Sequence, residues 1–265
     1  MKVRLGIDLR SGYIKKAQLL NAPVLLSANA LRTDKGDKWK RLPDFGDLDV
    51  ALDSGGFVAA LRGGFKFTMA EYLDLVQTMG PTWYAAMDYC CEPEIAGDRD
   101  KVAGRIDQTI ESLRAMLVMV KQRDMQEPMP VVQGWTPDEY EGCLERMAEL
   151  YEGGFPPLMG VGSVCRRPVH GETGLFNVLN RIDQWLAAHG HSTKLHLFGV
   201  KGQALTKLRA SFSDRVESTD SFAHAMRAQW AAWEARRSGD EPINRVDHME
   251  LWYHKNTPKQ RSLWD

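Results

Sequence analysis

Carboxylates, an amide and glycines stand directly after short apolar runs in this sequence. Asp53 follows VAL and precedes SGG, Asp88 follows AAM, and Gln133 follows VV. A third carboxylate, Asp220, ends the later run VEST. Oxygen groups of this kind do acid–base and nucleophilic chemistry when two or more are held together. Each carboxylate alone is more often a helix cap or an ion-pair partner. The prediction of an active site therefore depends on whether the fold brings them together.

The surrounding elements favour a barrel, because β-rich apolar runs alternate with amphipathic helical patterns. Helices are predicted over residues 99–124 and 136–151, the second opening with TPDEY. Seven parallel strands in 265 residues predict an α/β fold, a (β/α)8 TIM-like barrel in a single domain. The carboxyl ends of barrel strands gather catalytic groups at one mouth. The seven predicted strands lie within residues 24–30, 49–55, 82–89, 130–135, 157–163, 194–200 and 215–221.

The eighth strand is not assigned by the sequence. Residues 248–254, HMELWYH, either close the barrel as a strand or pack across it. We expect residues 1–237 to form the barrel and residues 238–265 to form a C-terminal tail that packs on it or closes it.

Cysteine usage argues against a metal or disulfide framework. Cys90, Cys91, Cys143 and Cys165 show no zinc-ligand spacing, so we expect no structural zinc site. Thiols stay reduced in the cytosol. Any chemistry is expected to come from oxygen and nitrogen groups.

Charge and hydropathy limit which partners and which cellular compartment we expect. The chain carries 34 basic and 35 acidic residues, so a nucleic-acid contact would need a local basic patch. No apolar run approaches the roughly 20 residues that cross a bilayer, and MKVRLGIDLR lacks the apolar core of a signal peptide. We expect a soluble cytoplasmic protein with no membrane partner.

Six motifs together resemble the tRNA-guanine transglycosylases. They are DSGGF at 53–57, MDYC at 87–90, VVQG at 131–134, GVGS at 160–163, FGVKG at 198–202 and the late Asp220. Their order and approximate spacing match that family over residues 24–225. The sequence has no C-x-C-x-x-C zinc motif, so the zinc subdomain of that family is expected to be absent. The short barrel with GVGSVCRR is most similar to the DpdA branch. That branch consists of paralogues in bacteria and phages that place 7-deazaguanine bases in DNA.

The resemblance implies two catalytic carboxylates. Asp220 would attack the anomeric carbon, and Asp53 would protonate the leaving guanine and later deprotonate the incoming base. Retaining glycosidases divide the work between two carboxylates in this way. A helix N-cap remains the alternative for Asp220.

The same resemblance implies a base-binding set. Asp88 would accept the guanine N1–H and N2 amine, Gln133 would contact O6 or N7, and backbone N–H groups near Gly162 would reach a carbonyl. Phe57 and Phe198 would sandwich the base, or are plain core aromatics. The predicted substrate-binding residues are Ser54, Gly55, Gly56, Phe57, Asp88, Cys90, Gln133, Gly134, Gly162, Ser163, Phe198 and Gly199.

Two departures from the family pattern bear on the substrate. Val58 stands where the tRNA enzymes usually have Gln, and Ser163 stands where bacterial ones have Glu. Ser163 removes a partner for the aminomethyl ammonium of the bacterial tRNA substrate. We therefore favour an uncharged 7-substituent, such as the nitrile of 7-cyano-7-deazaguanine.

Basic residues near the mouth are candidates for holding phosphates of a flipped nucleotide. Arg166, Arg167 and Lys201 are the best placed in sequence. The tail adds Arg236, Arg237, Lys255, Lys259 and Arg261, interleaved with Trp252, Tyr253 and Trp264, although these residues suit a solvated or docking face equally well. Among the histidines, His196 is expected in the core between strands, and His224 lies one helical turn beyond Asp220.

The sequence thus predicts a pentosyltransferase that replaces guanine in DNA with a 7-deazaguanine base through a covalent Asp220 intermediate, without cofactor or metal. The alternatives are a tRNA-guanine transglycosylase, a catalytically silent nucleic-acid-binding paralogue, and a glycosylase in which water replaces the incoming base. DNA is the expected polymer partner and tRNA the alternative. An accessory protein or a second copy of the chain is a further candidate.

Overall fold

The computed structural model describes residues 1–33, 35–36, 38–200, 202–241 and 244–257. Within these ranges the strands are β1 (Lys2–Ile7), β2 (Val24–Ser27), β3 (Val50–Asp53), β4 (Trp83–Tyr84), β5 (Val131–Val132), β6 (Leu158–Val161), β7 (Lys194–Leu197) and β8 (Val216–Ser221). The helices are α1 (Ser11–Leu20), α2 (Ala28–Leu31), α3 (Gly56–Leu61), α4 (Met69–Met79), α5 (Arg99–Gln122), α6 (Pro137–Ala148), α7 (Leu175–Ala188), α8 (Gly202–Ser211), α9 (Ala223–Ser238) and α10 (Arg245–Asn256).

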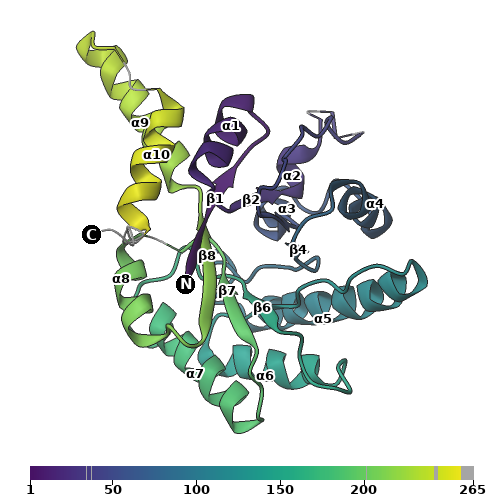
Figure 1. Ribbon diagram of the computed structural model, residues 1–265. Helices are drawn as coiled ribbons and strands as arrows, with labels where there is room; N and C mark the ends of the chain where they lie inside the picture. The colour runs from purple at the N-terminus through teal and green to yellow at the C-terminus, as the bar shows by residue number, and fades with distance from the viewer. Residues whose placement is uncertain (34, 37, 201, 242–243, 258–265) are drawn as a thin grey trace, which may run out of the picture.

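The strands form one curled parallel sheet with helices outside it (Figure 1). Their order is β4-β3-β2-β1-β8-β7-β6-β5 among the described residues. The edge strands β4 and β5 are linked by a parallel bridge between Ala85 and Met129. The Met129 N–H donates to the Tyr84 carbonyl over 2.8 Å, and the Ala86 N–H donates to the Met129 carbonyl over 2.9 Å. The predicted α/β class is confirmed, and the architecture is that of a TIM-like fold.

The eighth strand is β1, which the sequence interpretation missed. Its charged residues hid it, because Lys2 and Arg4 interrupt the apolar run of Val3, Leu5 and Ile7. Arg4 is only 2% exposed, and its guanidinium donates to both carboxylate oxygens of Asp49 over 2.8 and 3.0 Å. A buried charge needs such a partner. The pair allows a charged residue inside a central strand.

The strand alternative for residues 248–254 is wrong, since they lie in α10. Asn244 caps this helix by accepting the Val246 N–H over 3.0 Å. Met249 and Trp252 are buried three residues apart, which is helical and not strand spacing. The helix packs against α9, α1 and β1.

The predicted helices over 99–124 and 136–151 are confirmed as α5 and α6, which run over residues 99–122 and 137–148. Asp98 caps α5 by accepting the Lys101 N–H over 3.2 Å. Thr136 and Glu139 form a reciprocal capping box at the start of α6, with Pro137 in the first turn.

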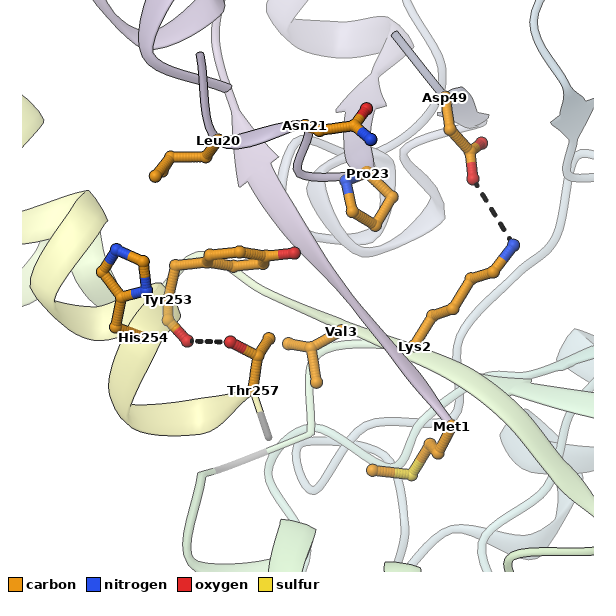
Figure 2. Close-up of a pocket in the computed structure, with 10 residues that line it drawn as sticks. All are labelled: Met1, Lys2, Val3, Leu20, Asn21, Pro23, Asp49, Tyr253, His254 and Thr257. Carbon is orange, nitrogen blue, oxygen red and sulfur yellow. Dashed lines mark hydrogen bonds and ion pairs between the residues drawn. The ribbon is translucent and has the colours of Figure 1, made fainter. Parts of the chain in front are cut away.

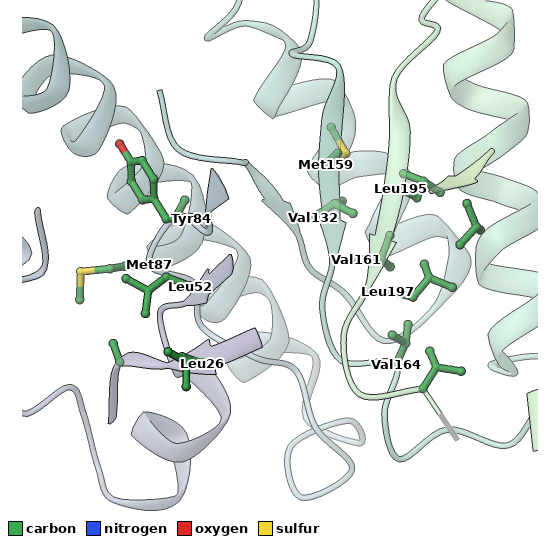
Figure 3. Close-up of a cluster of buried hydrophobic side chains, with 14 of the residues drawn as sticks. Leu26, Leu52, Tyr84, Met87, Val132, Met159, Val161, Val164, Leu195 and Leu197 are labelled. Atoms are coloured by element: carbon green, nitrogen blue, oxygen red, sulfur yellow. The ribbon is translucent and has the colours of Figure 1, made fainter. Parts of the chain in front are cut away.

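Neighbouring residues of β2, β3, β4 and β5 separate into two apolar layers, as expected from the two-residue period of a strand. The outer layer packs against the helices and includes Leu26, Leu52 and Val132 (Figure 3). The inner cluster is separate and lies within the curl of the sheet. It consists of Leu25, Ala51, Trp83, Ala85, Met129 and Val131, with Leu158 and Phe198 packed against it.

Candidate active site

A pocket of about 260 Å³ lies at the carboxyl ends of the strands. Sites for drug-sized ligands occupy roughly 300–1,000 Å³, so this one suits a compact ligand such as a single base. Most of the predicted site residues line it, as expected where parallel strand ends converge. They are Asp53, Gly55, Gly56, Phe57, Asp88, Cys90, Gln133, Gly162, Ser163, Phe198, Gly199 and Asp220.

Asp53 ends β3, and its carboxyl group lines the pocket. Burial raises the pKa of Asp53 to about 7, and the negative charges of Asp88 and Asp220 add to the rise. The nearby Gly55 N–H and Ser27 hydroxyl oppose the rise in pKa. A carboxyl group that titrates near neutrality can both give and take a proton, which general acid–base catalysis requires.

Asp220 lies near the end of β8 and is held from one side. Its Oδ1 accepts the Gly199 N–H over 2.8 Å and lies 3.4 Å from Nε2 of His196. His196 is fully buried, and its Nδ1 is 2.8 Å from the Ser218 hydroxyl. Burial lowers the pKa of His196, although the Asp220 carboxylate opposes this shift. A neutral imidazole therefore lies beside the Asp220 carboxylate.

A hydrogen-bond chain orients the Asp88 and Gln133 side chains. Both oxygens of Asp88 accept, Oδ1 from the Ser54 hydroxyl over 2.9 Å and Oδ2 from Nε2 of Gln133 over 2.5 Å. Oε1 of Gln133 accepts from the Ser163 hydroxyl over 2.6 Å, and that hydroxyl accepts the Cys91 N–H over 2.7 Å. Burial raises the pKa of Asp88, but the bonds from Ser54 and Gln133 favour its carboxylate form. These hydrogen bonds hold the Asp88 and Gln133 side chains in place at the pocket before any ligand enters.

Two glycines allow this close packing. A Cβ at Gly56 would lie 2.8 Å from Oδ1 of Asp88, and one at Gly162 would lie 2.1 Å from Nε2 of Gln133. Any side chain at either position would displace the groups of the hydrogen-bond chain.

The two predicted aromatics lie at different depths. Phe57 is 38% exposed at the mouth. Phe198 packs on the inner apolar cluster and meets the His196 ring edge-on, with centroids 4.7 Å apart. Cys90 is buried, its Sγ is 3.9 Å from the Gly56 carbonyl, and burial raises its pKa well above the usual range of a thiol.

Two of the predicted substrate-binding residues do not line the pocket. Ser54 is fully buried behind Asp88, where it supports that carboxylate. Gly134 packs against the start of α6, since a Cβ there would lie 2.9 Å from the Tyr140 backbone nitrogen. Ser54 and Gly134 therefore support the residues and the helix around the pocket.

The basic residues predicted to contact phosphates are engaged within the protein or lie outside the described residues. Arg167 is 3% exposed, and all of its guanidinium donors are engaged, with Ser163, Trp135, Thr173, Gly134 and Tyr140. It is therefore a structural residue, and its prediction as a phosphate contact does not hold. Arg166 is partly exposed and ion-paired to Glu94 at 2.6 Å. Lys201, Lys259, Arg261 and Trp264 lie outside the described residues.

The pocket also contains residues that were not predicted as site residues, namely Leu25, Ser27, Val58, Glu92, Cys165 and Phe222. Ser27 ends β2, so the rule that found Asp53 could have found it. Glu92 had no such signal, because it lies in the loop after β4. Burial raises the pKa of Glu92, while Arg166, 3.9 Å away, opposes the shift. His224, by contrast, is buried away from the pocket with Nε2 2.8 Å from the Gly6 carbonyl.

The described part of the chain holds no group of three or more His, Cys, Asp or Glu side chains arranged to bind a metal ion. Its helices include none that is long and apolar enough to span a bilayer.

Comparison with known proteins gives one family and a shared fold. The family model described as "DpdA: DeoxyPurine in DNA protein A" matches residues 37–237. No curated protein matches the chain. The YdjI aldolase of Escherichia coli K12 is similar in structure at 14% identity and a TM-score of 0.53, over 96% of this chain and 89% of the aldolase. A fructose-bisphosphate aldolase from Campylobacter jejuni matches at 12% identity and a TM-score of 0.46, over 96% of this chain and 85% of that one. The likeness to YdjI concerns the fold alone.

Proposed function

This chain belongs to the DpdA family, and we propose that it replaces guanine in DNA with a 7-deazaguanine base through a covalent Asp220 intermediate. The observation that carries the proposal is the meeting of Asp53, Asp88 and Asp220 in one base-sized pocket. Within it, burial and charge raise the pKa of Asp53 to about 7. Membership of the family supports DNA as the polymer.

The exchange proceeds in two displacements at the anomeric carbon. An oxygen of Asp220 attacks C1′ of the target nucleotide, the bond from C1′ to the guanine nitrogen breaks, and protonated Asp53 gives its proton to the departing base. The sugar is then an ester of Asp220. Ionised Asp53 takes the proton from the incoming base, whose nitrogen attacks C1′ and releases the Asp220 carboxylate. Asp53 ends as it began, protonated.

His196 and Gly199 are positioning groups for this step. The Gly199 N–H occupies one side of Oδ1 of Asp220, and the buried imidazole lies close to the same oxygen. The other carboxylate oxygen is thereby directed to the substrate.

Base recognition follows from the free hydrogen-bonding capacity of Asp88 and Gln133. Each oxygen of Asp88 accepts one bond within the protein and retains a lone pair for N1–H or the N2 amine of guanine. Gln133 uses one hydrogen of Nε2 on Asp88 and keeps the second for O6 or N7 of the base. A purine without these partners would leave buried groups unpaired at about 1–3 kcal/mol each.

The 7-substituent is proposed to be uncharged, and the nitrile of 7-cyano-7-deazaguanine fits this requirement. The Ser163 hydroxyl is neutral and already bonded to Gln133 and Cys91. Glu92 is the one lining carboxylate that would suit an ammonium instead, and it faces Arg166. Offering 7-cyano- and 7-aminomethyl-7-deazaguanine as competing bases tests this point. Preference for the aminomethyl base that is lost in Glu92→Gln would overturn it.

Incorporation of radiolabelled guanine into polymer tests the reaction itself. Wild type is incubated with plasmid DNA or with tRNA, beside Asp220→Ala and the control Asp74→Asn, which removes a carboxylate that is 62% exposed on α4. Label in DNA with wild type and Asp74→Asn, but not with Asp220→Ala, supports the proposal. Label in tRNA alone makes the chain a tRNA enzyme. Loss of guanine without incorporation makes it a glycosylase, and no change in either polymer leaves the silent paralogue.

A further inference from the structure

An apolar and aromatic stripe runs along the free face of α9. It consists of Phe222, Met226, Trp230 and Trp233, which recur at three- or four-residue spacing and so share one side of the helix. These side chains are 44%, 58%, 63% and 48% exposed, respectively. The opposite face is buried through His224, Ala225 and Ala228. We call the four exposed residues the α9 stripe.

The α9 stripe begins at the proposed active site. Phe222 lines the base pocket and follows Asp220 by two residues. From there α9 leads away from the carboxyl end of β8, and α10 returns beside it (Figure 1). Eleven residues separate Phe222 from Trp233, which is about 16 Å along a helix. The stripe therefore extends the mouth of the pocket outward along a single helix.

The charge on α9 is complementary to phosphate. Residues Ala223–Ser238 contain Arg227, Arg236 and Arg237 against the single acidic residue Glu234. The Arg237 guanidinium lies 4.6 Å from the centre of the Trp233 ring. Exposed aromatic rings interleaved with arginines are the composition of surfaces that bind unpaired nucleic-acid strands, where bases stack on the rings.

We propose that the α9 stripe binds the unpaired stretch of polynucleotide that flanks the target nucleotide. Flanking bases stack on Trp230 and Trp233, and their phosphates contact Arg236 and Arg237. The inference rests on the proposed function, because a nucleotide whose base sits in the pocket must be continued by strand at the mouth. A second copy of this chain fits less well, since a protein seated on Phe222 would cover the opening through which the polymer enters.

Binding of oligonucleotides tests the stripe without requiring turnover. A 20-nucleotide single strand and its duplex are titrated into wild type, Trp230→Ala/Trp233→Ala and Leu251→Ala, with fluorescence anisotropy of labelled DNA as readout. Leu251 is the control, as it is an apolar residue that is 61% exposed on α10 and not on α9. The double variant is expected to bind the single strand at least about fivefold more weakly, and Leu251→Ala like wild type. Equal unfolding temperatures establish that all three are folded.

Salt dependence tests the arginines. If Arg236 and Arg237 each neutralise one phosphate, Arg236→Gln/Arg237→Gln lowers the slope of log affinity against log salt by about 1.4 for a single strand. An unchanged slope removes both arginines from the interface.

Separate measurement of exchange distinguishes this inference from the proposed function. Wild-type exchange with a raised KM for DNA and unchanged kcat in the double variant supports both. Wild-type exchange together with unchanged DNA binding in the double variant overturns the stripe and leaves the function standing. If wild type shows no exchange but its DNA binding is weakened in the double variant, the proposed function is overturned and the stripe stands. A wild-type dimer that the double variant converts to monomer, with DNA binding intact, makes the stripe a self-association surface and overturns the inference.

Discussion

The two ends of the sheet carry hollows of different character. The amino-end hollow is the larger, about 640 Å³, and is lined by Met1, Lys2, Asp49 and Tyr253 among others (Figure 2). Asp49 there faces Lys2 at 3.7 Å and is paired with Arg4, which lowers its pKa. The mouth at the other end holds only about 260 Å³, but burial raises the pKa of Asp53 and Asp88 within it. Size does not distinguish the candidate site. Among the residues that the structure describes, Asp53 and Asp88 form no ion pair with a cation, whereas Asp49 pairs with both Lys2 and Arg4.

The largest difference between the two ends of the sheet is expected when one charged side chain is removed at each end. Asp220→Ala is expected to lower the rate of base exchange by at least about a thousandfold, because the covalent step loses its nucleophile. Lys2→Ala, in the amino-end hollow, should leave the rate unchanged. Single-turnover rates with plasmid DNA measure both. Comparable losses in the two variants would contradict the assignment of the mouth.

Asp53 makes the mouth sensitive to pH. Below the unfolded-state pKa of Asp, near 4, the group is neutral in both states. As pH rises toward 7 the unfolded chain ionises first, so stability falls, and the loss is complete above the folded pKa of about 7. Asp53→Asn should therefore be more stable than wild type by roughly 2–4 kcal/mol at pH 8 and about equal to it at pH 4. Urea unfolding at the two pH values measures the difference.

The same shift predicts the rate profile. Because the proposed first displacement uses protonated Asp53, kcat/KM of wild type should fall above about pH 7. The residual activity of Asp53→Asn should lack this limb. A wild-type profile that is flat from pH 6 to 9 would remove Asp53 from the role of acid.

At the amino end the expected effect is on stability and is smaller. Asp49→Ala leaves the Arg4 guanidinium buried without its carboxylate, so the free energy of unfolding should fall by about 2 kcal/mol. The penalty is moderated because the Asp49 side chain is 30% exposed. Exchange per folded molecule should match wild type. Urea unfolding and an activity assay on the same sample test both statements.

The smallest predicted effect is on base binding at the mouth of the pocket. Ser163→Ala leaves Oε1 of Gln133 and the Cys91 N–H without their partner. Gln133 is then less well oriented, and KM for the incoming base should rise about fivefold, or about 1 kcal/mol. Ser163→Gly, which removes the same hydroxyl at a φ of 54° that glycine adopts readily, should show the same rise. A change in kcat with KM constant would argue against a role in base binding.

The sequence was informative where one backbone rule decides the outcome. Parallel strands end at one edge, so Asp53, Asp88, Gln133 and Asp220 could be brought together without knowing any side-chain contact. The sequence did not predict the side-chain positions that depend on tertiary packing. Arg167 follows the same strand end as Ser163, yet turns inward to bind backbone carbonyls.

Strand β1 was missed for a related physical reason. Hydropathy treats Arg4 as a surface residue, whereas its charge is neutralised by Asp49, 45 residues away in the sequence. The role of Ser163 could not be foreseen either, since its two partners come from separate segments. A pattern along one strand carries no information about such partners.

The pairing of β1 with β8 has a consequence for biosynthesis. Arg4 lies opposite Asp220 in this parallel pair, so the first strand to be made completes the sheet with the last. At 5–20 residues per second, the ribosome needs roughly 10–40 s to pass from one to the other. During that interval Asp220 does not yet exist beside Asp53. The proposed active site is thus assembled only when β8 has paired with β1, and a chain that ends before β8 lacks the proposed nucleophile.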